Sequence, residues 1–250
     1  MLAKILYYRP RLEAALSELD RGRLKLPVAN PRLLFEDFDR LPVTLTELPT
    51  GPWSSPIADV VMLAKIALSA RPRRVLEVGS YRGYTARLLA EHTPPDTSIV
   101  ALDRDPLHGE AYRNSPLASK IERRIGNVDA AAFAGDKAAS YDLIFLDADH
   151  AYRAVKHDTE VLLPLLAPGG IFAWHDYANW GRFSGRNGVP EYLHQLARTC
   201  PLVAVGGSWL AAYSPAWATP DGAKRLMEAQ EGATLNGRPQ DPWSTLSLRG

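Results

Sequence analysis

The residues best suited to chemistry in this 250-residue chain fall in two short clusters, each directly after an apolar run. Asp147 and His150 follow YDLIFL, and His175 and Asp176 follow IFAW. Carboxylates and imidazoles bind divalent cations, and an imidazole titrates near neutral pH, so it can accept a proton from a hydroxyl group. The two clusters predict a metal site or an acid–base site.

A third group of residues predicts a ligand with a nucleoside part. The loop EVGSYRGYT contains Gly79 and Gly83, which let the backbone approach a ligand closely. Tyr81 stands where dinucleotide-binding loops have their second glycine, so a diphosphate has less room. Asp103 ends the next apolar run, where an acid bonds ribose hydroxyls in this kind of fold. Loop and acid together favour a nucleoside ligand without a diphosphate.

The elements that must position these residues alternate between strand and helix. Strands are expected at 75–78, 98–102, 120–125, 141–146 and 171–174, and helices at 56–70, 84–92, 151–166, 189–197 and 223–230. Most of these strands are nearly continuous apolar runs, which is typical of a parallel sheet covered on both faces. Runs 201–205 and 209–213 predict an antiparallel hairpin that closes the sheet edge. The expected fold is therefore α/β: a Rossmann-like doubly wound sheet, mostly parallel, with a C-terminal antiparallel hairpin and helices on both faces.

The polar residues at the predicted strand ends should form one site, because ligands of open α/β sheets bind outside the carboxyl ends of the strands. Any single acid among them could instead cap the helix that follows. The set comprises Glu77, Gly79, Asp103, Asn127, Asp147, Asp149, His150, His175 and Asp176.

The overall composition excludes several classes of protein. The chain is 46% hydrophobic and 23% charged with a net charge of +1, which disfavours nucleic acid as the main partner. One cysteine, Cys200, cannot form an internal disulfide. No run approaches the roughly 20 apolar residues of a membrane span, and the first 20 residues lack the apolar core of a secretory signal. We therefore expect a cytoplasmic protein without a membrane partner.

Several stretches resemble known methyltransferases. VLEVGSYRGYTARLLA resembles motif I of class I S-adenosylmethionine-dependent methyltransferases, most of all the catechol O-methyltransferase group, and IVALDRDP resembles their ribose-binding segment. FLDADHAYRAVKHD, LLAPGGIFAWHDY and GVPEYLHQL resemble a related small-molecule family that includes macrolide sugar O-methyltransferases. The resemblance covers residues 54–213 and implies an enzyme that uses S-adenosylmethionine.

The resemblance also implies which residues hold the cofactor. Asp103 would bind the ribose hydroxyls. Asn127 and Asp129 would border the adenine, although GNVDA departs from the commoner Gly-Asp pattern. Glu77, Gly79, Tyr81 and Thr85 would hold the methionine end, with help from Ser55. Gly83 and Asp147 would also belong to the cofactor site.

A metal and a general base are expected beside the cofactor. Asp147, His175 and Asp176 should end adjacent strands, which lie about 4.8 Å apart, so they can converge on one cation; the resembled enzymes bind Mg²⁺ there. His175 departs from the acid usual in those families, and imidazole suits Zn, Fe, Ni or Cu better than Mg; it could also face the substrate. His150 stands where sugar-type relatives have a histidine, and is the expected general base; its alternative role is to fix Asp149 at a helix N-terminus.

Three regions are expected along the chain. Residues 1–55, with an amphipathic stretch at 11–21, would form a substrate wall or dimer contact; 56–217 would be the S-adenosylmethionine-binding domain; and 218–250 a C-terminal extension. Phe35, Phe38 and Trp53 would belong to the wall or to the core. Aromatic and basic residues around the end of the fifth strand would form either a mobile lid or a loop anchor: Trp174, Tyr177, Trp180, Arg182 and Arg186.

The leading hypothesis is a metal-assisted O-methyltransferase acting on a hydroxyl of a small molecule such as a sugar, polyketide or phenol. One alternative is a metal-independent N- or C-methyltransferase. The others are a nicotinamide-dependent oxidoreductase, disfavoured by the missing GxGxxG, and a non-catalytic nucleoside-binding module. A homo-oligomer built through the terminal regions is also compatible with the sequence.

Overall fold

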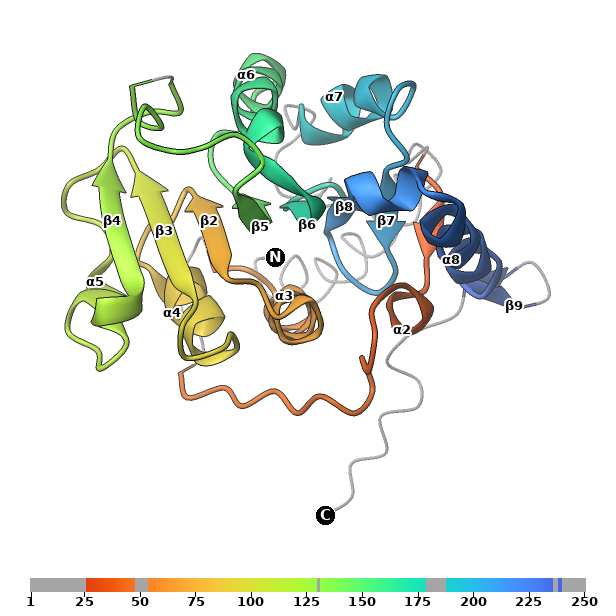
Figure 1. The fold of residues 1–250 in the computed structure, drawn as a ribbon, viewed down its shortest axis with the longest axis horizontal. Helices are drawn as coiled ribbons and strands as arrows, with labels where there is room; N and C mark the ends of the chain where they lie inside the picture. Colours follow the sequence, from red (N-terminus) through yellow and green to blue (C-terminus); the bar gives the residue numbers. More distant parts are fainter. Residues whose placement is uncertain (1–25, 48–53, 130, 179–187, 236–237, 240–250) are drawn as a thin grey trace, which may run out of the picture.

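An eight-stranded sheet forms the centre of the computed structural model, which describes residues 26–47, 54–129, 131–178, 188–235 and 238–239 (Figure 1). β8 runs antiparallel to both of its neighbours, and the other neighbouring pairs are parallel. The α/β prediction, with a mostly parallel sheet and an antiparallel hairpin, is therefore confirmed. Across the sheet the strands are β1 (Val28–Ala29), β7 (Val203–Val205), β8 (Ala211–Tyr213), β6 (Leu166–Trp174), β5 (Tyr141–Leu146), β2 (Arg74–Val78), β3 (Ser98–Asp103) and β4 (Ile121–Ile125).

Helices cover both faces of this sheet. One face carries α2 (Pro31–Leu34), α3 (Ile57–Ala70), α4 (Tyr84–Glu91) and α8 (Pro220–Glu231), and the other carries α6 (Tyr152–Leu162) and α7 (Val189–Leu196) (Figure 1). Strand side chains alternate between the faces, so Val75 packs in the α3–α4 core and Leu76 in the α6–α7 core. The smaller elements are α5 (Glu110–Arg113), η1 (Ala118–Lys120), η2 (Leu163–Leu165), η3 (Pro215–Ala218), β9 (Thr234–Leu235) and β10 (Arg238–Pro239).

The chain before α3 is fastened to that helix by a buried lysine. The Lys65 ammonium donates hydrogen bonds to the carbonyls of Phe38 and Leu41, the latter at 3.0 Å. Phe35 and Phe38 are themselves buried in the α3–α4 core, so they pack in the core rather than line a wall. Trp53 and the helix expected at 11–21 lie outside the described residues.

The sheet edge differs from the expectation. The hairpin of β7 and β8 does not close it, because β1 adds a further parallel strand beyond β7, with Val28 opposite Ala204. The Asn30 N–H then donates to the carbonyl of Ala229 in α8 at 2.8 Å. A three-residue strand such as β7 leaves unpaired backbone groups, and β1 satisfies them. The prediction of a hairpin edge is therefore wrong.

Two predicted boundaries also shift around β6. The strand begins at Leu166 rather than at 171, and its pairing with β5 shifts register between Tyr141 and Leu143. Residues Pro168, Gly169 and Gly170 thus lie within the strand, where the pairing is irregular. The preceding helix ends at Leu162 and is followed by η2.

A buried acid joins β2, β4 and β5. Asp136 lies between β4 and β5, and its side chain is 4% exposed. Arg74 Nη2 lies 3.0 Å from its carboxylate, Tyr141 Oη donates to it at 2.9 Å, and Arg124 pairs with it as well. Burial raises the pKa of Asp136, but the hydrogen bonds from Arg124, Arg74 and Tyr141 outweigh burial and hold this pKa below the ordinary value.

We predict that Asp136→Asn lowers the free energy of unfolding at pH 7 by about 2–3 kcal/mol, because two partly buried guanidinium groups lose their anion. A depressed carboxyl pKa stabilises the fold only above the unfolded-state value, so the difference should shrink as the pH falls below about 4. Urea unfolding at pH 7 and pH 3.5 measures both effects. Glu122→Gln, at an exposed partner of Arg124, is the control; an equal loss for Asp136→Asn at both pH values would contradict this account.

Candidate functional site

The predicted strand-end residues meet at the carboxyl edge of the sheet. Gly79 follows β2, Asp147 follows β5, and His175 follows β6, on three adjacent strands. Backbone hydrogen bonds run on past the strand ends: Asp147 N donates to the Val78 carbonyl at 2.9 Å, and His175 N to the Leu146 carbonyl at 3.1 Å. The site residues are thus held by the same backbone pairing that forms the sheet.

Gly79 allows the loop after β2 to cross closely over the end of β5. Its φ is +89°, and a Cβ atom built on it would lie 2.0 Å from the backbone oxygen of Asp147. Two side-chain-bearing residues of the site also adopt the left-handed conformation, Tyr81 at φ 44° and Asp176 at φ 59°. Such conformations cost free energy and are common where a site needs a fixed side-chain direction.

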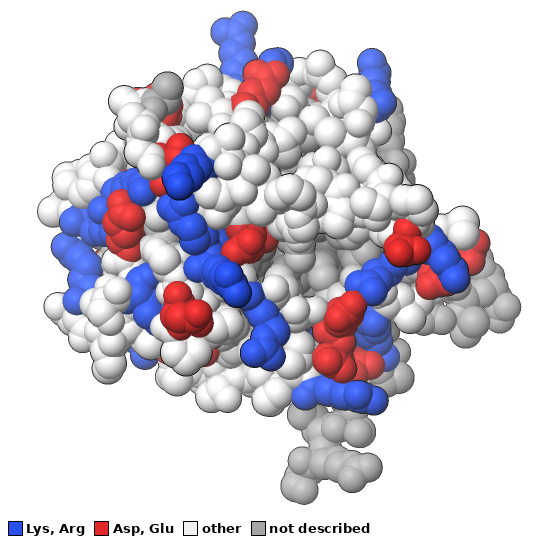
Figure 2. All heavy atoms as spheres, in the orientation of Figure 1, with Lys and Arg blue, Asp and Glu red and all other residues white. Residues whose placement is uncertain are grey.

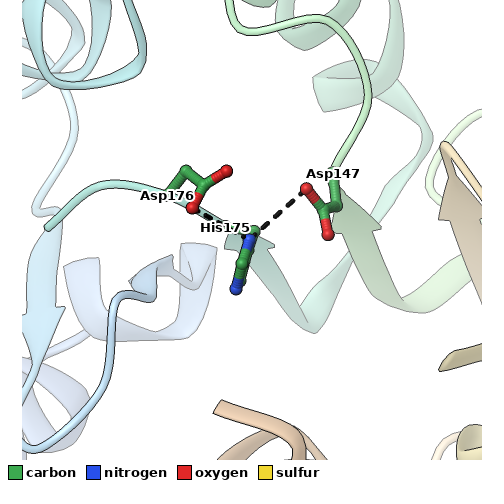
Figure 3. Close-up of side chains that lie close together, drawn as sticks. All are labelled: Asp147, His175 and Asp176. Atoms are coloured by element: carbon green, nitrogen blue, oxygen red, sulfur yellow. Dashed lines mark ion pairs between the residues drawn. The ribbon is translucent and has the colours of Figure 1, made fainter. Parts of the chain in front are cut away.

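Asp147, His175 and Asp176 form a compact cluster of metal-ligating side chains (Figure 3). One ligand atom from each lies within 4.8 Å of the others. His175 Nδ1 faces the Oδ1 atoms of Asp147, at 3.4 Å, and Asp176, at 3.3 Å. It is buried and makes no hydrogen bond of normal geometry with the described residues. A buried nitrogen that faces two carboxylate oxygens in this way fits a divalent cation.

The electrostatics of this cluster are strongly coupled. Burial disfavours the imidazolium, but Asp147, Asp176 and Asp59 outweigh burial and raise the pKa of His175 well above its ordinary value. Burial likewise opposes ionisation of Asp176, yet the close contacts with the His150 and His175 imidazoles hold its pKa well below the ordinary range. The two carboxylates are therefore ionised and attract positive charge.

His150 lies beside the same two acids. Its Nε2 atom is 2.7 Å from Oδ2 of Asp176 and 3.6 Å from Oδ1 of Asp147. Burial disfavours its cation, but the hydrogen bonds with Asp147 and Asp176 outweigh burial and raise the pKa of His150 to about 9. The structure thus brings His150, Asp147, His175 and Asp176 together, and His150 stays partly exposed.

Two adjoining cavities meet at this cluster. The larger, of about 570 Å³, lies within the usual size range of ligand sites. The second is lined by Ser55, Gly83, Thr85 and His175, and both share Gly79, Tyr81 and Asp147. Of the predicted cofactor residues, the larger cavity is lined by Gly79, Tyr81, Asp103, Asn127 and Asp147.

Asp103 is held by three donors at the rim of the larger cavity. Its Oδ2 atom accepts from Tyr81 N at 2.7 Å, and Oδ1 accepts from Asp105 N at 2.8 Å and lies 2.9 Å from Nδ1 of His108. The His108 ring also meets Tyr81 edge to face, with centroids 4.8 Å apart. Sequence reasoning assigned His108 no role; its place soon after Asp103 was the only available signal.

Two predicted cofactor residues line neither cavity. Glu77 is buried on the α4 side of the sheet and accepts a hydrogen bond from the backbone of Ala86. Burial, followed by Asp147 and Asp103, raises the pKa of Glu77 to about 8. Asp129 is exposed, and its carboxylate accepts from Ala132 N at 2.8 Å. The structure therefore places Glu77 beneath the site and Asp129 outside both cavities.

For two of the five residues expected to form either a lid or a loop anchor, burial favours the anchor. Trp174 is fully buried and donates through Nε1 to Thr159 at 2.9 Å. Tyr177 is fully buried as well, and its hydroxyl accepts from Leu26 N at 2.9 Å. Both are anchors, because a fully packed side chain cannot cover a substrate. Trp180, Arg182 and Arg186 lie outside the described residues.

The structure adds one buried acid that sequence reasoning missed. Asp59 belongs to the first turn of α3 and is 3% exposed. Its Oδ2 atom lies 3.1 Å from Nε2 of His175, and its Oδ1 atom accepts from Trp209 N at 2.8 Å. The available signal was an acid in a largely apolar helical stretch, IADVVMLAKIALSA.

The segment that holds most of this site matches a known class of domain. Residues 76–177 match the family described as a methyltransferase domain, and the matched segment holds the first loop, Asp103, Asp147 and the end of β6. This match confirms the resemblance to class I S-adenosylmethionine-dependent methyltransferases.

Several of the similar proteins are O-methyltransferases, and one shorter match is to a tRNA1(Val) (adenine(37)-N6)-methyltransferase of Aeromonas salmonicida, 36% identical over 86 residues. Over 154 residues the chain is 29% identical to a caffeoyl-CoA O-methyltransferase of Populus kitakamiensis, covering 57% of this chain and 64% of the relative. Over 133 residues it is 28% identical to a catechol O-methyltransferase of Mycobacterium tuberculosis, covering 47% and 59%. The chain therefore spans less than two thirds of the length of these relatives.

A solved structure supports the fold alone. The O-methyltransferase TomG from Streptomyces achromogenes, in complex with SAM, superposes with a TM-score of 0.52 at 22% identity, covering 68% of this chain and 83% of TomG. Among the described residues, no helix has the length and apolar character needed to cross a bilayer. Basic and acidic side chains lie interspersed on the face shown in Figure 2.

We predict that Gly79→Ala lowers the free energy of unfolding by more than about 3 kcal/mol, because a left-handed residue gains a Cβ atom that overlaps fixed backbone. Thermal unfolding checks this. Gly169→Ala is the matched control, since nothing lies within 4 Å of a Cβ atom there, and its stability should stay within about 0.5 kcal/mol of the parent. Equal stability of the two variants would contradict the close approach seen at Asp147.

Proposed function

We propose that this chain is an S-adenosylmethionine-dependent O-methyltransferase that acts on a hydroxyl group of a small molecule. The observation that carries the proposal is that Asp147 lines both of two adjoining cavities in a segment that matches a methyltransferase domain. His150 lines the larger cavity, and Asp176 contacts His150 at 2.7 Å. The caffeoyl-CoA and catechol O-methyltransferase relatives support oxygen as the methyl acceptor.

The cofactor would span both cavities. Asp103 would bind the ribose hydroxyls in the larger one and Asn127 would border the adenine, as both side chains line it. The methionine end would lie along the loop from Gly79 to Thr85, towards Ser55 in the second cavity. Because Asp147 lines both cavities, the sulfonium would come close to the acidic cluster.

Catalysis would depend on positioning and on removal of one proton. The sulfonium is already activated, so the enzyme must hold the acceptor oxygen in line with the methyl group. His150 Nε2 would accept the hydroxyl proton. Asp147, His175 and Asp176 would hold a divalent cation, which would supply Lewis acidity towards the acceptor oxygen and offset the negative charge that raises the pKa of His150.

We predict that S-adenosylhomocysteine binds saturably in calorimetric titration and that Asp103→Asn weakens this binding roughly tenfold to hundredfold, because charged hydrogen bonds contribute about 1.5–3 kcal/mol. Glu122→Gln, on the exposed surface of β4, should bind like the parent. Saturable binding of NADH by fluorescence, without binding of S-adenosylhomocysteine, would contradict the proposed cofactor.

We predict that His150→Ala lowers kcat about 10²–10⁴-fold with S-adenosylhomocysteine affinity unchanged, since general-base catalysis typically contributes this much. Methyl transfer to a panel of sugar, polyketide and phenol acceptors provides the rate. Arg153→Ala, an exposed change in helix α6, which begins two residues after His150, is the control. Unaltered turnover in His150→Ala would remove His150 from the base role and leave the cofactor proposal intact.

A further inference from the structure

The side of His175 that faces away from the acidic cluster is bound to Asp59. Nε2 of His175 lies 3.1 Å from Oδ2 of Asp59, and both side chains are buried. A carboxylate can only accept a hydrogen bond, so the proton of this pair belongs to Nε2. A neutral His175 therefore has its lone pair on Nδ1, the atom that faces Asp147 and Asp176.

Asp59 is itself fixed in orientation. Its second oxygen, Oδ1, accepts from the backbone N–H of Trp209 at 2.8 Å, and its backbone belongs to the first turn of α3. Since a backbone N–H can only donate, Oδ1 must remain an acceptor. The two hydrogen bonds use one oxygen each and leave the carboxylate a single way to face His175.

The cluster consequently presents one imidazole nitrogen and two carboxylates to a shared point. Mg²⁺ prefers an all-oxygen, octahedral ligand set and binds nitrogen poorly. Imidazole suits first-row transition metals, and a carboxylate bonded to the far nitrogen orients the ring and raises its basicity as a ligand. Asp59 stands in that second position, behind the ligand.

We propose, building on the function proposed above, that Asp59 is a positioning residue that holds His175 with Nδ1 directed at Asp147 and Asp176, and that the resulting site selects a divalent transition metal over Mg²⁺. Among the described residues, the Asp59 carboxylate contacts His175 and the Trp209 N–H, and it forms no hydrogen bond or ion pair with Asp147 or Asp176. Its effect on the metal passes through the His175 ring.

An isosteric substitution separates this role from simple packing. In Asp59→Asn, the amide oxygen can still accept from Trp209 N, which turns the amide NH₂ towards His175 Nε2. That geometry favours the opposite tautomer, with a proton on Nδ1 pointing at the two carboxylates. The variant keeps the size of the side chain and blocks the nitrogen that would bind the metal.

The test measures binding of Co²⁺ and of Mg²⁺ to the full chain. Calorimetry gives both affinities, and the visible absorption of bound Co²⁺ gives a second measure. We expect the parent to bind Co²⁺ more tightly than Mg²⁺, and Asp59→Asn to bind Co²⁺ about 10–100-fold more weakly. His175→Asp, which makes the ligand set all-oxygen, should lower the preference for Co²⁺ over Mg²⁺. In a His175→Ala background, Asp59→Asn should cause no further loss.

Controls keep structural effects apart. Lys65→Met removes the other buried charge of α3, six residues after Asp59. This variant should lower the melting temperature without changing Co²⁺ affinity. The parent provides a readout independent of any variant: in Zn²⁺-loaded, ¹⁵N-histidine-labelled protein, two-bond ¹H–¹⁵N correlations should show His175 bonded to metal through Nδ1.

Two results would overturn the role of Asp59: Co²⁺ affinity within twofold of the parent in Asp59→Asn, or ligation of the metal through Nε2. Tighter binding of Mg²⁺ than of Co²⁺ by the parent would overturn the metal preference. S-adenosylhomocysteine titration of the same samples distinguishes these outcomes from failure of the methyltransferase proposal, because cofactor binding does not require the metal-bound nitrogen.

Discussion

The close approach of Gly79 to the backbone of Asp147 is the constraint on which the site depends. The loop after β2 crosses the end of β5 with no room for a side chain, and this brings the predicted cofactor loop and the acidic cluster to one point. Both cavities include these two residues. A larger separation would divide the site into a nucleotide cleft and an unrelated cluster of charges.

Charge balance is the second organising feature. Three carboxylates, from Asp59, Asp147 and Asp176, surround the imidazoles of His150 and His175 in a largely buried region. Each member is stabilised by opposite charge, so loss of any one leaves a buried charge without its partner. The cluster is therefore a single electrostatic unit, and the effects of substitutions within it are not expected to add.

Sequence reasoning reached the parts of this protein that depend on local pattern. Apolar runs located the central strands, and the rule that ligands bind at their carboxyl ends brought Asp103, Asp147, His150, His175 and Asp176 into one list. The first four line two adjoining cavities, and Asp176 lies beside Asp147 and His175. It did not reach features that exist only between distant segments. Asp59 contacts His175 across 116 positions of sequence, and nothing in its neighbourhood along the chain marks that partner. For the same reason the sequence left open whether Trp174 forms a lid or an anchor, because its contacts are with Phe172 and with Thr159 on another element.

The placement of β1 has a consequence for how the chain assembles during synthesis. The strand that borders the sheet comes early in the sequence, whereas its partners, β7 and the carbonyl of Ala229, come late. At typical ribosomal rates of about 5–20 residues per second, Val28 and Ala29 emerge on the order of ten to forty seconds before β7 exists. During that interval the nascent segment has no native pairing partner, and the central strands can pair with one another before β1 joins the sheet. Completion of the sheet is thus a late, long-range event, and a ribosome that stalls before β7 leaves an exposed strand for chaperones to shield.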